Sequence, residues 1–117
     1  MGTAPAKVFH PGSKTSVIAA DPTAPTGIQV TPRDGQATYS GNCFKFTNLG
    51  SATAHISWGI TAASAQARAV APTAGNPQIT MALFGGAEMV AMLPLESYFS
   101  AVTTVAGSVL VQSGEGF

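Results

Sequence analysis

The sequence predicts an all-β fold, a single β-sandwich of jelly-roll type with about eight short antiparallel strands. The 117 residues include 13 Gly and 8 Pro spread along the chain, which leaves no room for long helices. Short segments alternate apolar and polar residues, and turn signals separate them about every 8 to 12 residues. Strand count does not give strand order, so an immunoglobulin-like sandwich remains an alternative.

Residues 1–26 are predicted to be an extended N-terminal arm that precedes a sandwich domain of residues 27–117. Proline fixes φ and lacks a backbone N–H, so a proline-rich stretch is hard to place inside a sheet. Only residues 15–20 of the arm have the pattern of a strand. A terminus without fixed structure is the alternative interpretation. The four prolines of the arm are Pro5, Pro11, Pro22 and Pro25.

Alternating residues define the strands that follow the arm. Residues 42–47 place Phe44 and Phe46 on one face, and residues 54–60 place Trp58 on one face with two isoleucines. The two segments are therefore predicted to be adjacent antiparallel strands that share an aromatic face. Another strand is expected at residues 28–31, and turns are expected at residues 33–36 and 48–51.

The second half of the chain adds further short strands. Residues 61–71 are rich in alanine but have no apolar stripe for a helix to bury, so we predict a loop leading into a short strand near residues 67–71. Residues 88–93 are apolar on both faces, which indicates a central strand or one covered by a partner. The remaining strands are expected at residues 78–83, 98–103 and 108–112.

The chain carries very little charge. Only 9% of its residues are charged, against about a quarter in ordinary soluble domains. Five basic and five acidic residues cancel to a formal net charge of zero, and near-zero net charge promotes association. The composition therefore favours a component of an assembly. Nucleic-acid binding is not expected, since the basic residues are scattered instead of forming one basic face. They are Lys7, Lys14, Arg33, Lys45 and Arg68.

No membrane span, metal site or cofactor is predicted. No segment approaches the roughly 18 to 20 consecutive apolar residues of a spanning helix. The single cysteine, Cys43, cannot form an internal disulfide. The possible metal ligands His10, His55 and Cys43 lack the close spacing of known zinc motifs. No cofactor-binding motif is present either.

The sequence also argues against an enzyme. Cys43 and His55 could meet across a hairpin as a thiol–imidazole pair, but a cysteine in the middle of a strand is usually a packing residue. Glu88 and Glu96 flank an apolar strand at its ends, where solvated charges are expected. Carbohydrate binding by aromatic side chains stays an alternative, although Trp58 is in phase with its apolar neighbours. The other aromatic candidates are Tyr39 and Tyr98.

Five segments follow one another after Cys43: Phe-Thr-Asn-Leu-Gly (46–50), Ala-His-Ile-Ser-Trp-Gly (54–59), Pro-Thr-Ala-Gly-Asn-Pro (72–77), Met-Val-Ala-Met-Leu-Pro (89–94) and Val-Leu-Val-Gln-Ser-Gly-Glu-Gly (109–116). A strand ending in Trp-Gly is thus followed by an apolar terminal strand and a Gly-acid-Gly ending. This order of features resembles that of the small β-rich virion proteins of tailed bacteriophages. The resemblance implies a β-sandwich subunit bound to a capsid or tail, with no catalytic residues.

Together, these observations predict a capsid decoration (cement) protein in the virion, assembled in the host cytoplasm. Its expected partners are the major capsid protein and neighbouring copies of itself, as a homo-oligomer. The arm could add a strand to a neighbour's sheet edge. A minor tail, collar or head-fibre component and a carbohydrate-binding module are the alternatives. The residues predicted to contact a partner are Val8, Phe9, Val17, Ile18 and Met89.

Overall fold

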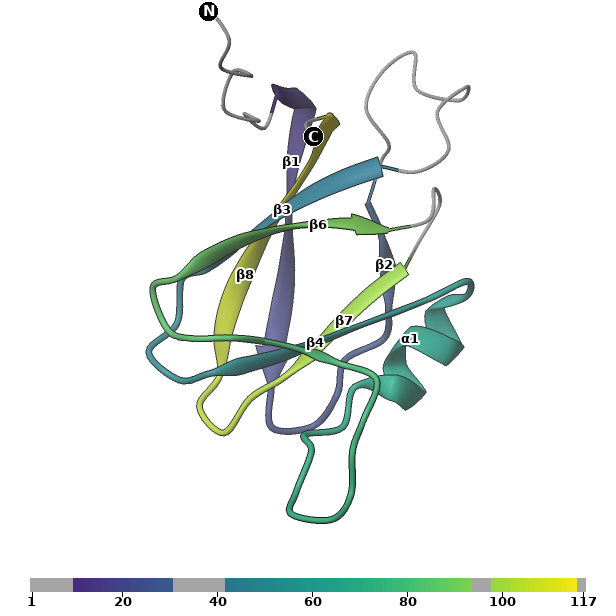
Figure 1. The fold of residues 1–117 in the computed structure, drawn as a ribbon, viewed down its shortest axis with the longest axis vertical. Helices are drawn as coiled ribbons and strands as arrows, with labels where there is room; N and C mark the ends of the chain where they lie inside the picture. Colours follow the sequence, from purple (N-terminus) through teal and green to yellow (C-terminus); the bar gives the residue numbers. More distant parts are fainter. Residues whose placement is uncertain (1–9, 31–41, 94–97, 116–117) are drawn as a thin grey trace, which may run out of the picture.

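A computed structural model describes residues 10–30, 42–93 and 98–115 of the chain. In these residues strands predominate, with a single short helix, so the predicted all-β class is confirmed (Figure 1). The elements are β1 (His10–Asp21), β2 (Ile28–Gln29), β3 (Asn42–Asn48), β4 (Ala54–Gly59), α1 (Ala62–Arg68), β5 (Met81–Leu83), β6 (Glu88–Leu93), β7 (Tyr98–Val102) and β8 (Gly107–Glu115).

The strands join in one curved sheet that nearly closes into a barrel. Their order is β5-β4-β7-β1-β8-β3-β6, and β2 pairs with β7 beside this path. The end of β1 runs parallel to β7, whereas the other pairs of strands are antiparallel. The antiparallel jelly-roll sandwich that the sequence predicted is therefore not confirmed.

The strand β1 lies in the middle of the sheet, and this differs from the predicted extended arm. It pairs with β8 from His10 to Ala20 and with β7 at its end. Its prolines do not prevent this. Pro11 lies before the register shift that precedes Thr15, and the next two prolines follow the end of the strand. The first nine residues of the predicted arm lie outside the described residues.

The core of the barrel is aromatic and aliphatic. The rings of Phe44 and Phe46 each make an edge contact with Phe99, with ring centroids 5.0 and 5.4 Å apart. The predicted hairpin of residues 42–47 and 54–60 is wrong in its pairing, since β3 pairs with β6 and β8 and β4 pairs with β5 and β7. The remaining buried apolar residues of this core are Ile18, Ala20, Val30, Ala54, Ile56, Leu83, Leu93, Ala101, Val109 and Val111.

The helix α1 replaces the loop and strand that the sequence predicted for residues 61–71. Thr61 caps its first turn, because the Thr61 hydroxyl accepts from the Ser64 N–H and the Ser64 hydroxyl accepts from the Thr61 N–H. No wide apolar stripe is needed, since the helix buries only small groups such as Ala65. Alanine propensity together with this capping box accounts for the helix.

Candidate docking surface

One side of the barrel's outer surface is covered by the chain itself. The helix α1 packs on the outer face of β4 and β7, to the right in Figure 1. The Ser57 hydroxyl donates to the Ala65 carbonyl at 2.6 Å, and the Ser100 hydroxyl donates to the Pro25 carbonyl at 2.7 Å. Small residues on the outer face of these strands thus allow close contact with the backbone of α1 and of the segment before β2. Each of the two serine hydroxyls donates to a carbonyl of these segments.

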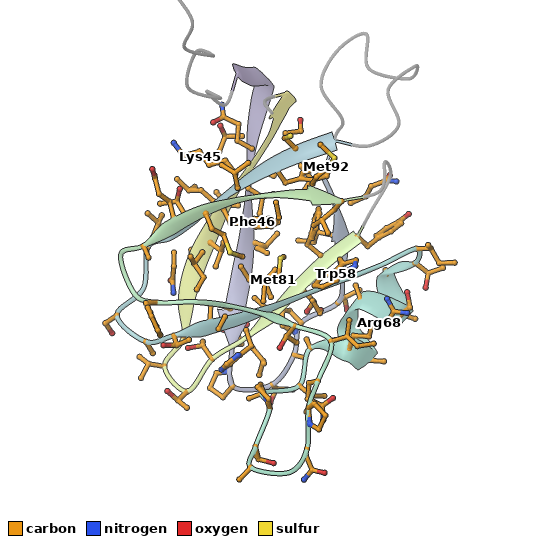
Figure 2. The ribbon with its side chains drawn as sticks, in the orientation of Figure 1. Lys45, Phe46, Trp58, Arg68, Met81 and Met92 are labelled. Atoms are coloured by element: carbon orange, nitrogen blue, oxygen red, sulfur yellow. The ribbon has the colours of Figure 1, made fainter. Side chains whose placement is uncertain are left out.

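Two glycines make this close approach possible. A Cβ on Gly27 would lie 2.7 Å from the Ala62 carbonyl oxygen, and a Cβ on Gly59 would lie 2.8 Å from the Ala65 nitrogen. The Arg68 guanidinium, labelled on α1 in Figure 2, donates to the Trp58 carbonyl at 3.0 Å. The outer face of β4 and β7 is therefore covered by internal contacts.

On the opposite side of the barrel no helix of the described residues packs over the strands, although Cys43, which lies between Met92 and Gly114 in the register of that side, is buried. The strands of this side, β1, β8, β3 and β6, are neighbours in the sheet, and their outward side chains form one continuous surface, which we name the bare face. The pairing places Val17 beside Leu110 and Lys45 beside Val90. The bare face consists of Thr15, Val17, Lys45, Thr47, Glu88, Val90, Met92, Leu110 and Gln112.

The bare face is more apolar than the outer face of an ordinary antiparallel sheet. Such a sheet normally alternates apolar residues inward with polar residues outward. Here Val17 is 57% exposed and Met92 is 58% exposed, and Leu110 and Val90 are half-buried between polar neighbours. In Figure 2, Met92 lies along β6, away from α1. Exposed apolar side chains set among polar ones are typical of protein–protein contact surfaces, so this surface fits contact with another protein.

The charges on the bare face neutralise one another. The Lys45 ammonium lies 3.4 Å from a Glu88 carboxylate oxygen, across the β3–β6 pair. The other residues of the face are apolar or neutral and polar. A partner would therefore meet a surface that is almost neutral, and steering by long-range charge would contribute little to binding.

The five residues predicted to contact a partner lie in different surroundings in the structure. Val17 lies on the bare face. Ile18, the next residue, points into the core and is only 1% exposed, so it is unsuited to a partner contact. Met89 is half-buried and packs against the core from β6. Val8 and Phe9 lie outside the described residues. The alternation of side chains along β1 explains why Val17 and Ile18 have opposite roles.

Sequence reasoning missed Val90, Met92 and Leu110 as surface residues of one face. The signal was partly visible, since residues 88–93 are apolar on both faces and residues 109–111 are an unbroken apolar run. Nothing in the sequence, however, indicates that these two segments flank the same strand, β3. The face exists only because the topology brings four separated segments together.

The sheet does not place Cys43 and His55, the candidate thiol–imidazole pair, on adjacent strands. Cys43 is buried on β3, and His55 is half-buried on β4, a strand that does not pair with β3. The His55 Nδ1 is buried without a hydrogen-bond partner in the described part of the chain. Among residues 10–30, 42–93 and 98–115, no three His, Cys, Asp or Glu residues come together as metal ligands. Glu96 lies outside those ranges.

The aromatic candidates for carbohydrate stacking are only partly available. Trp58 is half-buried and packs against the core. Tyr98 is half-buried at the start of β7. Tyr39 lies outside the described residues. A flat, exposed aromatic platform is therefore not formed by Trp58 or Tyr98.

Comparison with known proteins gives no relative: no family model, no curated protein and no solved structure matches this chain. In the described residues, no helix is long and apolar enough to cross a membrane. The bare face is consequently the candidate functional site, on the basis of its composition and its position alone.

Proposed function

We propose that this chain is a capsid decoration protein of a tailed bacteriophage that binds the shell of the major capsid protein through the bare face. The observation that carries the proposal is the contrast between the two sides of the barrel. The side over β4 and β7 is covered by α1, whereas the bare face exposes Val17 and Met92, is nearly neutral and is covered by no helix of the described structure. The low overall charge and the resemblance to small virion proteins support the same role.

The size of the bare face also fits this role. Four strands about 4.8 Å apart and roughly five residues long present an area on the order of 300 Å². A standard stable interface buries about 800 Å² on each partner. A single copy would therefore bind weakly through this face alone. Weak contacts are sufficient for a protein that covers a shell in many copies, because each copy adds its own contribution to the stability of the shell.

The position of the protein in the particle is tested by its copy number. Quantitative mass spectrometry of purified particles measures the ratio of this chain to the most abundant shell protein. A ratio near one, or a simple fraction of one, agrees with a decoration protein. A few copies in each particle would instead indicate a tail, collar or head-fibre component, and absence of the chain from particles would rule out a virion role.

The role of the bare face is tested by charge substitution. Val17→Asp and Met92→Asp each place a carboxylate on an exposed position of this face, so we expect each to weaken binding to undecorated shells at least tenfold, as measured by co-sedimentation. Ile60→Asp is the matched control, because Ile60 is 85% exposed and adjoins α1 on the covered side. Equal binding by all three variants would contradict docking through the bare face.

A further inference from the structure

A second apolar surface lies at one end of the barrel, where three loops meet. These are residues 49–53 between β3 and β4, residues 84–87 between β5 and β6, and residues 103–106 between β7 and β8. They come together at the lower left of Figure 1. We name this surface the loop end. It exposes three large apolar side chains, Leu49 (59%), Phe84 (72%) and Val105 (54%).

Backbone hydrogen bonds hold the three loops against one another. The Leu49 N–H donates to the Ser108 carbonyl at 2.9 Å, which ties the first loop to the start of β8. The Asn48 N–H donates to the Ala87 carbonyl at 3.0 Å, and the Gly86 N–H donates to the Asn48 carbonyl at 3.0 Å. The three exposed apolar side chains therefore extend from loops whose backbone is held by hydrogen bonds.

Close backbone contacts reinforce this arrangement. A Cβ on Gly107 would lie 3.1 Å from the Gly50 Cα, and a Cβ on Gly85 would lie 2.5 Å from the Ser51 carbonyl oxygen. The loops thus pack backbone to backbone, with no large side chain between them. Because the backbone of these loops is already held in place, it loses little conformational entropy when the apolar side chains bind a partner. Such ordering before binding is a property of effective anchor residues in interfaces.

The charge of the loop end indicates which partner it fits. Residues 48–53, 84–87 and 103–108 contain no Asp, Glu, Lys, Arg or His. Close to a symmetry axis, a residue of one copy lies near the same residue of another copy, so a charged residue there would face its own charge. A surface without any charge avoids that repulsion. The formal net charge of zero on the whole chain also removes repulsion between complete copies.

We propose that the loop end is a self-association surface, through which copies of this chain form a symmetric oligomer with Leu49, Phe84 and Val105 at the contact. This surface uses different residues from the bare face, and the proposal does not require that the partner of the bare face is a shell. In an oligomer several bare faces act together, so their weak individual affinities combine into a larger one.

The oligomer is tested by sedimentation equilibrium of the full chain from about 5 to 200 μM, since an interface of modest size dissociates in the micromolar range. The protomer mass is 11.8 kDa. We expect wild type to have at least twice this mass at the highest concentration. Phe84→Asp and Leu49→Asp are each expected to raise the dissociation constant at least tenfold. Ile60→Asp, the control on the covered side, is expected to behave as wild type.

Two results would overturn the proposal: a wild-type mass of 11.8 kDa at every concentration, or oligomers that persist unchanged in both Phe84→Asp and Leu49→Asp. Circular dichroism of each variant checks that the sheet is intact, and both positions are mainly exposed, so folding does not depend on them. The shell-binding assay distinguishes this result from the proposed function. Val17→Asp should remain oligomeric while it loses shell binding.

Discussion

At the scale of single residues, Asn48 is the main link between the loops. Its side chain is almost fully buried at the end of β3. The Asn48 Nδ2 donates to the carbonyls of Ala52 and Leu83, both at 2.9 Å, and its Oδ1 accepts from the Gly50 N–H at 2.9 Å. One amide group therefore satisfies three backbone groups, two in the loop of residues 49–53 and one at the end of β5.

We expect Asn48→Ala to lower the free energy of unfolding by about 3 kcal/mol, because it leaves buried backbone groups without partners. Urea unfolding followed by the fluorescence of Trp58 measures this change. Asn76→Ala is the control, since the exposed Asn76 side chain makes a single hydrogen bond, to the Thr73 hydroxyl. That variant should change stability by less than about 0.5 kcal/mol. A similar loss in both variants would contradict the special role of Asn48.

At the scale of elements, the existence of most strands could be predicted, but their partners could not. Alternation identified residues 42–47 and 54–60 as strands, since their large apolar residues recur with period two in the sequence. Proximity in sequence then indicated a hairpin. In the structure, the loop after Asn48 instead leads to the other side of the barrel, held by hydrogen bonds that involve residues 83–87. Long-range contacts of this kind leave no local pattern.

The helix α1 shows a second limit of sequence patterns. A helix is normally recognised by an apolar stripe, but α1 contacts the sheet through Ala65 and through a carbonyl that accepts from Ser57. Neither of these two contacts produces a signal in the hydropathy of the sequence. The capping residues Thr61 and Ser64 were present in the sequence and are the local signal that was overlooked.

The same capping residues give a prediction for this element. We expect Thr61→Ala to destabilise α1 by about 1 kcal/mol, because the Ser64 N–H loses its acceptor. The barrel does not depend on this cap. Hydrogen exchange should therefore show faster exchange of amides in residues 62–68 and unchanged exchange in β8. Thr73→Ala, in the exposed segment before β5, is the control and should leave α1 unchanged. Uniformly faster exchange throughout the sheet would show that α1 and the barrel unfold as one unit.

At the scale of the whole molecule, two features act together: the chain carries few charges, and its uncovered surfaces expose large apolar side chains. The bare face contains the Lys45–Glu88 pair, which is partly exposed, and such pairs contribute little to stability. The loop end contains no charge at all. Contacts made by both surfaces should therefore depend on the removal of apolar area from water more than on attraction between charges.

This balance predicts how association responds to salt. Raising NaCl from about 0.05 to 0.5 M shortens the Debye length from roughly 14 to 4 Å and strongly screens exposed charges. Because the formal net charge is zero, we expect the dissociation constant for self-association to change by less than about twofold. Sulfate should tighten association, since it favours burial of apolar surface. Sedimentation equilibrium in both salts measures these effects. A tenfold weakening in NaCl would instead show that charges hold the copies together, and the apolar loop end would then not be the contact.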